Sequence, residues 1–203
     1  MRDDFLRGAR LVLAALSRPE VARAWDEPSV LDQQTVGSLA GHLARGGVWV
    51  VGDYLDLDPA TEATHPSAEG YYAWVATLDE SAHEGIRERG AVLAAEGADA
   101  IVGHLDERLA LLDARLAVEP VDRILPVAGG TMVLDDFLAT RLVEQVVHLD
   151  DLGRSVGIDC GAPDDLAAMV AHLGLGVALL RHGPTEVLRL LYRDAPPGVL
   201  PVL

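Results

Sequence analysis

The sequence predicts an all-α protein built as a bundle of long helices, and three observations lead to this prediction. Apolar residues recur at steps of three or four over most of the 203 residues, which is the spacing of helices with one buried face. Clusters of proline, glycine and aspartate separate these periodic stretches, as turns do. No half of the chain shows the two-residue alternation of strands. A chain of this length is expected to bury one sizeable core.

The first half of the chain is expected to contain two helices and a long loop. The apolar spacing predicts a first helix over 5–25, and Asp26-Glu27-Pro28-Ser29 ends it. Thr35 is a suitable N-cap for a second helix over 35–54. Residues 58–70 are rich in proline, glycine and polar side chains, so we expect a loop there.

The second half is expected to contain three further helices and one short extended segment. A long helical stretch is predicted over 79–116, with four glycines as points of irregularity. Proline and paired glycines allow an extended turn or hairpin between 121 and 131. Helices are then predicted over 133–156 and 163–181.

We divide the chain into a helical bundle over residues 1–183 and a short C-terminal tail over 184–203, with no second domain. The tail has too few residues for a core of its own. We expect it to hold a brief helix around 187–192, before Pro196-Pro197.

The charge balance argues against two classes of partner. With 32 acidic and 16 basic residues, the formal net charge is -16, so nucleic acid and anionic membranes are not expected as partners. All basic residues are arginine, which excludes Schiff-base chemistry and a P-loop lysine. The N-terminus lacks the apolar run of a signal peptide, and Cys160 is the single cysteine. We therefore expect a cytoplasmic protein.

Glu144 and His148 form the most informative pair of the chain. They are four residues apart in a predicted helix, so their side chains stand one turn apart on one face and could share a metal ion. Apolar neighbours indicate that this face points inward. Taken alone, the pair is a weak signal and is more typical of a salt bridge or a surface pair.

His42 strengthens the metal interpretation. It occupies the middle of the second predicted helix among small and apolar residues. In a helical bundle, one histidine from this helix and the Glu144/His148 pair from another could converge as three ligands, leaving a fourth position for water or substrate. A hydrogen-bonded core histidine is the alternative.

Two further residues are candidates for a catalytic role. Arg141 lies one turn before Glu144 and could either orient that carboxylate or attract the carboxylate of an anionic substrate. Asp151 could accept a hydrogen bond from the His148 ring, or it could be a surface carboxylate.

Three residues near His42 are candidates for lining a ligand pocket. Trp49 and Asp53 lie seven and eleven positions after His42, on the same side of a regular helix, and Arg45 lies one turn after it. Core packing is the alternative role for Trp49, and a solvated helix end is the alternative for Asp53.

Two blocks of sequence resemble a known family. Residues 25–44, with Thr35-Val-Gly-Ser-Leu-Ala-Gly-His42-Leu-Ala, and residues 141–152, with Arg141-x2-Glu144-x2-Val-His148-x2-Asp151-Leu, resemble the N-terminal metal-binding domain of mycothiol-dependent maleylpyruvate isomerases. That domain belongs to the DinB-like superfamily. The resemblance covers most of residues 5–182, and it implies a DinB-like four-helix bundle with an additional C-terminal helix.

The resemblance also implies a chemistry. It places a divalent metal, typically zinc, on His42, Glu144 and His148, with mycothiol, the low-molecular-weight thiol of actinobacteria, at the open coordination position. The implied function is a metal-dependent isomerase or S-transferase that acts on a small electrophile. A hydrolase of the same fold and a non-catalytic binding module are the alternatives. The expected partners are the thiol and the electrophile, and a homodimer stays open.

Overall fold

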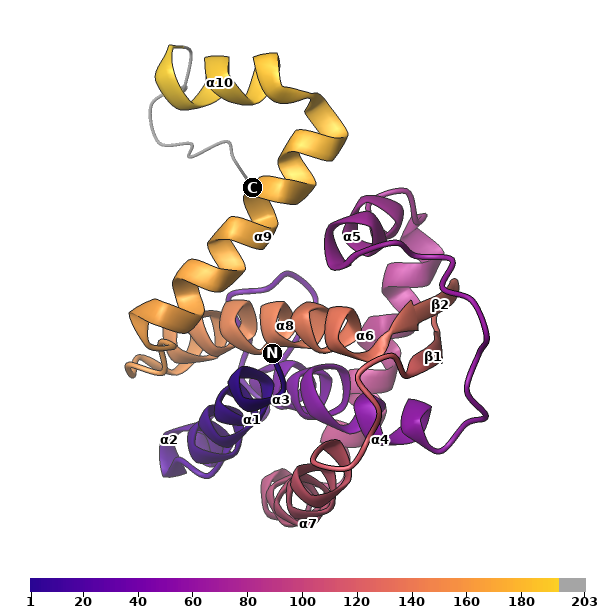
Figure 1. Ribbon diagram of the computed structural model, residues 1–203. Helices are drawn as coiled ribbons and strands as arrows, with labels where there is room; N and C mark the ends of the chain where they lie inside the picture. Colours follow the sequence, from indigo (N-terminus) through magenta and orange to yellow (C-terminus); the bar gives the residue numbers. More distant parts are fainter. Residues whose placement is uncertain (194–203) are drawn as a thin grey trace.

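Four helical segments surround the core of the molecule (Figure 1). In the computed structural model, which describes residues 1–193 apart from the side chains of 82 and 83, these segments are α1, the run α3–η1–α4, α7 and α8. Their inward faces are apolar, and Phe5, Leu39, Leu105 and Phe137 are each no more than 1% exposed. The all-α bundle predicted from the sequence is confirmed.

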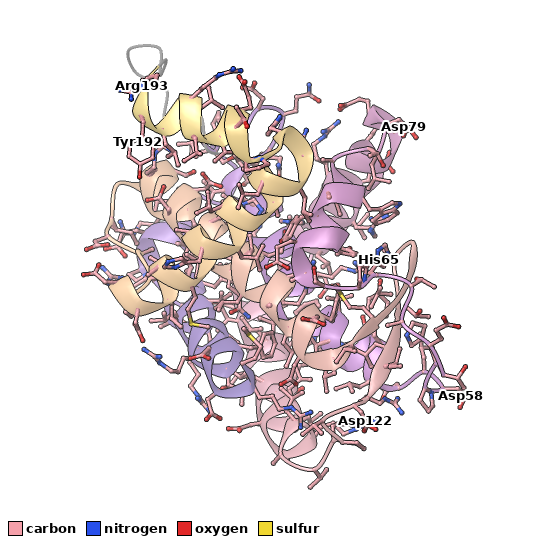
Figure 2. The ribbon with its side chains drawn as sticks, turned by 45° about the horizontal axis from the view of Figure 1, so that its top comes forward. Asp58, His65, Asp79, Asp122, Tyr192 and Arg193 are labelled. Carbon is pink, nitrogen blue, oxygen red and sulfur yellow. The ribbon has the colours of Figure 1, made fainter. Side chains whose placement is uncertain are left out.

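The remaining elements lie around this bundle. In Figure 1, α9 rises from the end of α8 and passes beside α5, and α10 follows at its far end. Figure 2 shows Tyr192, the last residue of α10, and Arg193, which follows it, on the opposite side of the view from Asp122, which precedes the hairpin. In chain order the elements are α1 (Arg2–Leu16), α2 (Pro19–Arg23), α3 (Val36–Ala44), the π-helical η1 (Arg45–Trp49), α4 (Val50–Leu55), α5 (Ala68–Val75), α6 (Glu80–Ala94), α7 (Ala98–Leu116), β1 (Ile124–Val127), β2 (Gly130–Val133), α8 (Leu134–Val156), α9 (Asp164–His182) and α10 (Pro184–Tyr192).

The first predicted helix is two helices. The sequence predicted a single helix over 5–25, but α1 ends at Leu16 and α2 begins at Pro19. Arg18, which precedes the proline, is extended, with φ -72° and ψ 133°. Proline disfavours helical backbone in the residue before it and has no N–H to donate, so the helix is interrupted there.

The second predicted helix is helical throughout but not regular. Thr35 caps it as expected, because its hydroxyl accepts a hydrogen bond of 3.1 Å from the Ser38 N–H. Between Arg45 and Trp49 the backbone adopts a π-helical turn, which the sequence analysis did not predict. A π turn contains an extra residue and therefore rotates the residues after it to a different face.

The region predicted as a loop over 58–70 contains the start of a helix. Ser67 caps α5 by accepting a hydrogen bond of 3.2 Å from the Gly70 N–H. The helix then runs to Val75 through residues that carry little helical periodicity, and it packs against α8 and α9. Tertiary contacts rather than local pattern decide this helix, which is why the sequence analysis missed it.

The stretch predicted as one helix over 79–116 is also divided. α6 ends at Ala94, and α7 begins after Gly97. Gly97 has a φ of +88°, a conformation that glycine adopts readily and other residues rarely adopt. The break at this glycine separates α6 from α7.

The C-terminal half agrees more closely with the predictions. β1 and β2 form the expected antiparallel hairpin, with Leu125 opposite Met132. α8 and α9 begin and end within one residue of the predicted helices, and α10 is the brief helix expected around 187–192. Pro196-Pro197 lies outside the described residues. The division into a bundle over 1–183 and a tail over 184–203 stays a prediction.

Two glycines set the distance between α3 and α6. A Cβ atom on Gly41 would lie 2.5 Å from the Gly90 carbonyl oxygen, and a Cβ on Gly90 would lie 2.7 Å from that of Ser38. Backbone atoms cannot move aside as a flexible side chain can. The close packing of α6 on the helix that carries His42 therefore requires glycine at both positions.

We predict that Gly90→Ala lowers the free energy of unfolding by about 1–3 kcal/mol, because the added methyl group forces the two backbones apart. Gly103→Ala in α7 is the matched control, since a Cβ there meets nothing within 4 Å. This control should instead gain about 0.5–1 kcal/mol from better helix propensity. Urea unfolding of both variants measures the difference, and equal stability of the two would contradict the prediction.

Candidate metal centre

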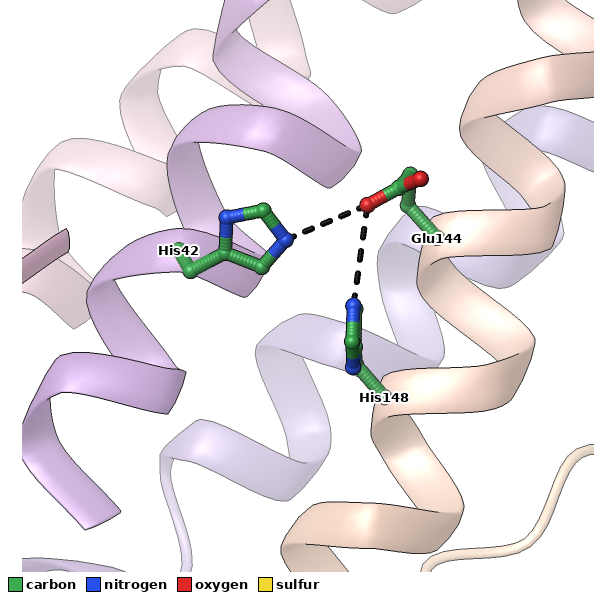
Figure 3. Close-up of side chains that lie close together, drawn as sticks. All are labelled: His42, Glu144 and His148. Atoms are coloured by element: carbon green, nitrogen blue, oxygen red, sulfur yellow. Dashed lines mark hydrogen bonds and ion pairs between the residues drawn. The ribbon is translucent and has the colours of Figure 1, made fainter. Parts of the chain in front are cut away.

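Three side chains from two helices converge at one point (Figure 3). His42 comes from α3, and Glu144 and His148 come from successive turns of α8. The Glu144 Oε2 atom lies 3.1 Å from His42 Nε2 and 3.6 Å from His148 Nε2. The two imidazole rings are nearly perpendicular, with centroids 4.9 Å apart. The convergence expected from the sequence is therefore present in the fold.

The spacing of these donor atoms fits a small divalent cation. One ligand atom from each residue lies within 4.8 Å of the other two. Tetrahedral ligands about 2.1 Å from a zinc ion are about 3.4 Å apart, close to the two shortest separations here. Two imidazole nitrogens and one carboxylate oxygen also form a donor set that zinc favours. The role of the three residues as metal ligands stays a prediction.

Glu144 is held in its charged form. Burial by itself would raise the pKa of this carboxyl, but hydrogen bonds from His148 and His42, together with the charge of Arg141, hold the pKa well below its usual range. The side chain is only 19% exposed. A buried carboxylate of this kind needs cationic partners, and the site supplies them.

His148 is oriented by Asp151. Its Nδ1 atom lies 3.0 Å from Asp151 Oδ2, so Nδ1 carries the proton and Nε2 faces Glu144. Burial opposes a charged imidazole, but the hydrogen bonds to Asp151 and Glu144 prevail and raise the pKa of His148 to about 9. Asp151 thus occupies the position that the sequence analysis expected for a partner of this ring.

Arg141 is buried but does not pair directly with Glu144. In the described part of the chain no carboxylate oxygen lies within 4 Å of its guanidinium. Its Nε donates to the Thr140 hydroxyl at 3.0 Å, and one terminal nitrogen donates to the Gly46 carbonyl at 2.9 Å. The orienting role that the sequence analysis considered for Arg141 therefore does not rest on a direct ion pair with Glu144, and it stays a prediction. Arg141 acts on the carboxylate through its charge alone.

Tyr72 is a site residue that the sequence analysis missed. Its hydroxyl oxygen lies 3.0 Å from Glu144 Oε1 and 2.9 Å from the Thr140 carbonyl oxygen. Burial and the nearby Glu144 raise the pKa of the phenol well above its usual value, so it stays protonated. The available signal was Tyr71-Tyr72-Ala-Trp74, a cluster of aromatic residues in a chain that has only nine.

Trp49 and Asp53 do not reach this site. They lie with Arg108 in a separate hollow, where Arg108 bonds Asp53 at 2.9 Å and covers the Trp49 ring at 5.2 Å. The sequence analysis placed both residues on the face of His42 by assuming a regular α-helix. The π-helical turn at 45–49 moves them off that face. Arg45, within that turn, borders both hollows.

A cavity of about 450 Å³ opens next to His42 and Glu144, within the range of small-molecule sites. Arg141 contributes a positive charge to its lining. Four of the nine aromatic residues of the chain also border it. These are Tyr54, Tyr71, Tyr72 and Trp74. The cavity therefore combines a charged end with an extensive aromatic wall.

The family model of the mycothiol maleylpyruvate isomerase N-terminal domain matches residues 5–153, which is more than half of the chain. The chain belongs to this family. This is a family of enzymes. The resemblance inferred from the sequence is therefore confirmed.

A solved structure shows the same fold. The crystal structure of a histidine-to-alanine mutant of mycothiol-dependent maleylpyruvate isomerase superimposes with a TM-score of 0.54 at 17% sequence identity. The match covers 86% of this chain and 68% of the other. No curated protein sequence is significantly similar to this chain. Among the described residues, no helix is both long and apolar enough to cross a membrane.

We predict that His148→Ala abolishes stoichiometric zinc binding and leaves the helical content largely intact. The substitution removes one of the three candidate ligands, whereas apolar packing holds the bundle. Metal analysis and far-ultraviolet circular dichroism measure the two effects. His172→Ala, which removes an exposed histidine of α9, is the control. Loss of the fold in His148→Ala would mean that the metal has a structural role.

Proposed function

We propose that this protein is a divalent-metal-dependent enzyme that uses a low-molecular-weight thiol for isomerisation or S-transfer on a small electrophile. Zinc is the proposed metal, with His42, Glu144 and His148 as its ligands, and mycothiol is the proposed thiol. The observation that carries the proposal is the convergence of three donor atoms beside a cavity of about 450 Å³. Membership of the isomerase-domain family supports it.

The donor set suits activation of a thiol. Two imidazoles and one carboxylate would hold a divalent ion, leave it with a net positive charge and leave room for a further ligand. A bound divalent metal lowers the pKa of a thiol, so that the nucleophilic thiolate forms near neutral pH. Asp151 fixes the His148 ring with Nε2 toward Glu144. The hydrogen bonds from His148 and His42, together with the charge of Arg141, keep Glu144 ionised.

Arg141 indicates what the electrophile carries. The net charge of -16 repels anions from the protein as a whole, so an anionic substrate needs a local cation. Arg141 supplies a permanent charge at the cavity, and Gly46 and Thr140 fix its position. We therefore assign it the role of binding a carboxylate group of the substrate.

The sequence analysis also gave alternative functions for this site and predictions about the location and oligomeric state of the protein. A hydrolase that activates water at the metal, or a binding module without catalysis, would share the three ligands. The cytoplasmic location and the homodimer stay predictions. The thiol and the electrophile are the proposed partners.

Metal analysis of protein purified without a chelating tag, followed by thermal shifts, tests the proposed function. We expect about one zinc per chain and a higher melting temperature with mycothiol than with glutathione, because ligand binding stabilises the folded state. His148→Ala should lose both effects. Stoichiometric metal with no response to any thiol would favour the hydrolase, and protein without affinity for metal would favour the binding module.

We predict that Arg141→Met weakens binding of maleylpyruvate by about tenfold or more, because the substitution removes a buried charge. The zinc content should stay unchanged, because the Gln145 side chain still donates to the Gly47 carbonyl and holds the π-helical turn on α8. The binding that remains should also depend less on salt. Arg108→Met is the control, since Arg108 borders the other hollow. Titration calorimetry at two salt concentrations gives both quantities. Loss of zinc would instead show that Arg141 acts by orienting Glu144.

A further inference from the structure

The two oxygens of the Glu144 carboxylate have different surroundings. Oε2 faces His42 Nε2 at 3.1 Å and His148 Nε2 at 3.6 Å, where a metal would be shared. Oε1 lies 3.0 Å from the hydroxyl oxygen of Tyr72. One oxygen is therefore directed to the candidate metal site, and the other is engaged by a phenol from a different helix.

The phenol has one proton and two acceptors within reach. The Thr140 carbonyl lies 2.9 Å from the Tyr72 oxygen, and Glu144 Oε1 lies 3.0 Å from it. A carbonyl inside an α-helix already accepts the N–H of the residue four positions on, whereas a carboxylate is a charged and stronger acceptor. The phenol proton is thus donated to Glu144.

We propose that Tyr72 is a positioning residue that restricts Glu144 to a single metal-binding oxygen. This inference rests on the proposed metal site. A carboxylate can bind a cation through one oxygen or through both. With Oε1 held by the phenol, the protein offers three donor atoms, and the fourth position stays available to the thiol. Without the phenol, Oε1 is free to turn toward the metal and compete for that position.

Tyr72 reaches the site from helix α5, whereas the three candidate ligands come from α3 and α8. Helix α5 is capped by Ser67, and its C-terminal half packs near the hairpin through Trp74. The adjacent Tyr71 belongs to the same helix and borders the same cavity, but its ring packs on that of His65, with centroids 5.2 Å apart. Figure 2 marks His65 between α5 and the hairpin. Because Tyr71 borders the cavity, the control is Tyr192 of α10, which is exposed and does not border it.

The experiment compares Tyr72→Phe with Tyr192→Phe in the Co²⁺-loaded full chain. Both variants keep the aromatic ring, so the packing of α5 is retained, and circular dichroism checks the fold. The first readout is the visible spectrum of Co²⁺, whose intensity falls when a fifth ligand joins a tetrahedral site. The second readout is the affinity of 2-mercaptoethanol, followed through its sulfur-to-cobalt charge-transfer band.

We expect the Tyr72→Phe spectrum to lose intensity and its affinity for 2-mercaptoethanol to fall by about tenfold, the lower end of effects seen when a partner of a metal ligand is removed. Tyr192→Phe should match the wild-type protein in both readouts. An unchanged spectrum and affinity in Tyr72→Phe, or equal changes in both variants, would overturn this inference while the metal site stands. Wild-type protein that binds no Co²⁺ would overturn the metal site and this inference together.

Discussion

The docking of a π-helical turn onto α8 is the interaction on which the site depends. The carbonyls of Gly46 and Gly47 accept hydrogen bonds from Arg141 at 2.9 Å and from Gln145 at 2.8 Å. These bonds join the helix that carries His42 to the helix that carries Glu144 and His148. Gln145 is fully buried, and a Cβ atom on Gly8 of α1 would collide with its side chain. The close packing of α1 on Gln145 therefore requires glycine at position 8. The separation between the candidate ligands follows from these bonds.

Local charge at the site contrasts with the charge of the whole protein. The chain has a net charge of -16, yet the interior of the site holds a permanent cation, Arg141, beside two histidines. Glu144 and Asp151 are the carboxylates that touch these histidines, and each makes a specific hydrogen bond. Ordered charges of this kind remain effective because the side chains are shielded from water. A metal ion and an anionic ligand would both find complementary groups here.

The cavity wall is assembled from segments that have weak local signals. Trp74 of α5 packs against Gly129 in the hairpin turn, where any side chain would collide with the indole. Gly129 has a φ of +76°, which also favours glycine. The hairpin and α5 thus close one side of the cavity together. Tyr72 reaches Glu144 only because this contact and the packing on α9 hold the short helix in place.

The sequence by itself determined the helical bundle, the Thr35 cap, the hairpin and the shared face of Glu144 and His148, because each depends on residues close together in the chain. It also indicated His42 as the third member of the site. The tertiary structure alone decided the π-helical turn, which moves Trp49 and Asp53 to another hollow, and the helix that brings Tyr72 to Glu144. Both depend on contacts between distant segments. The spacing of residues along one helix assumes a constant number of residues per turn. It cannot reveal a π-helical turn that is stabilised by hydrogen bonds from a second helix.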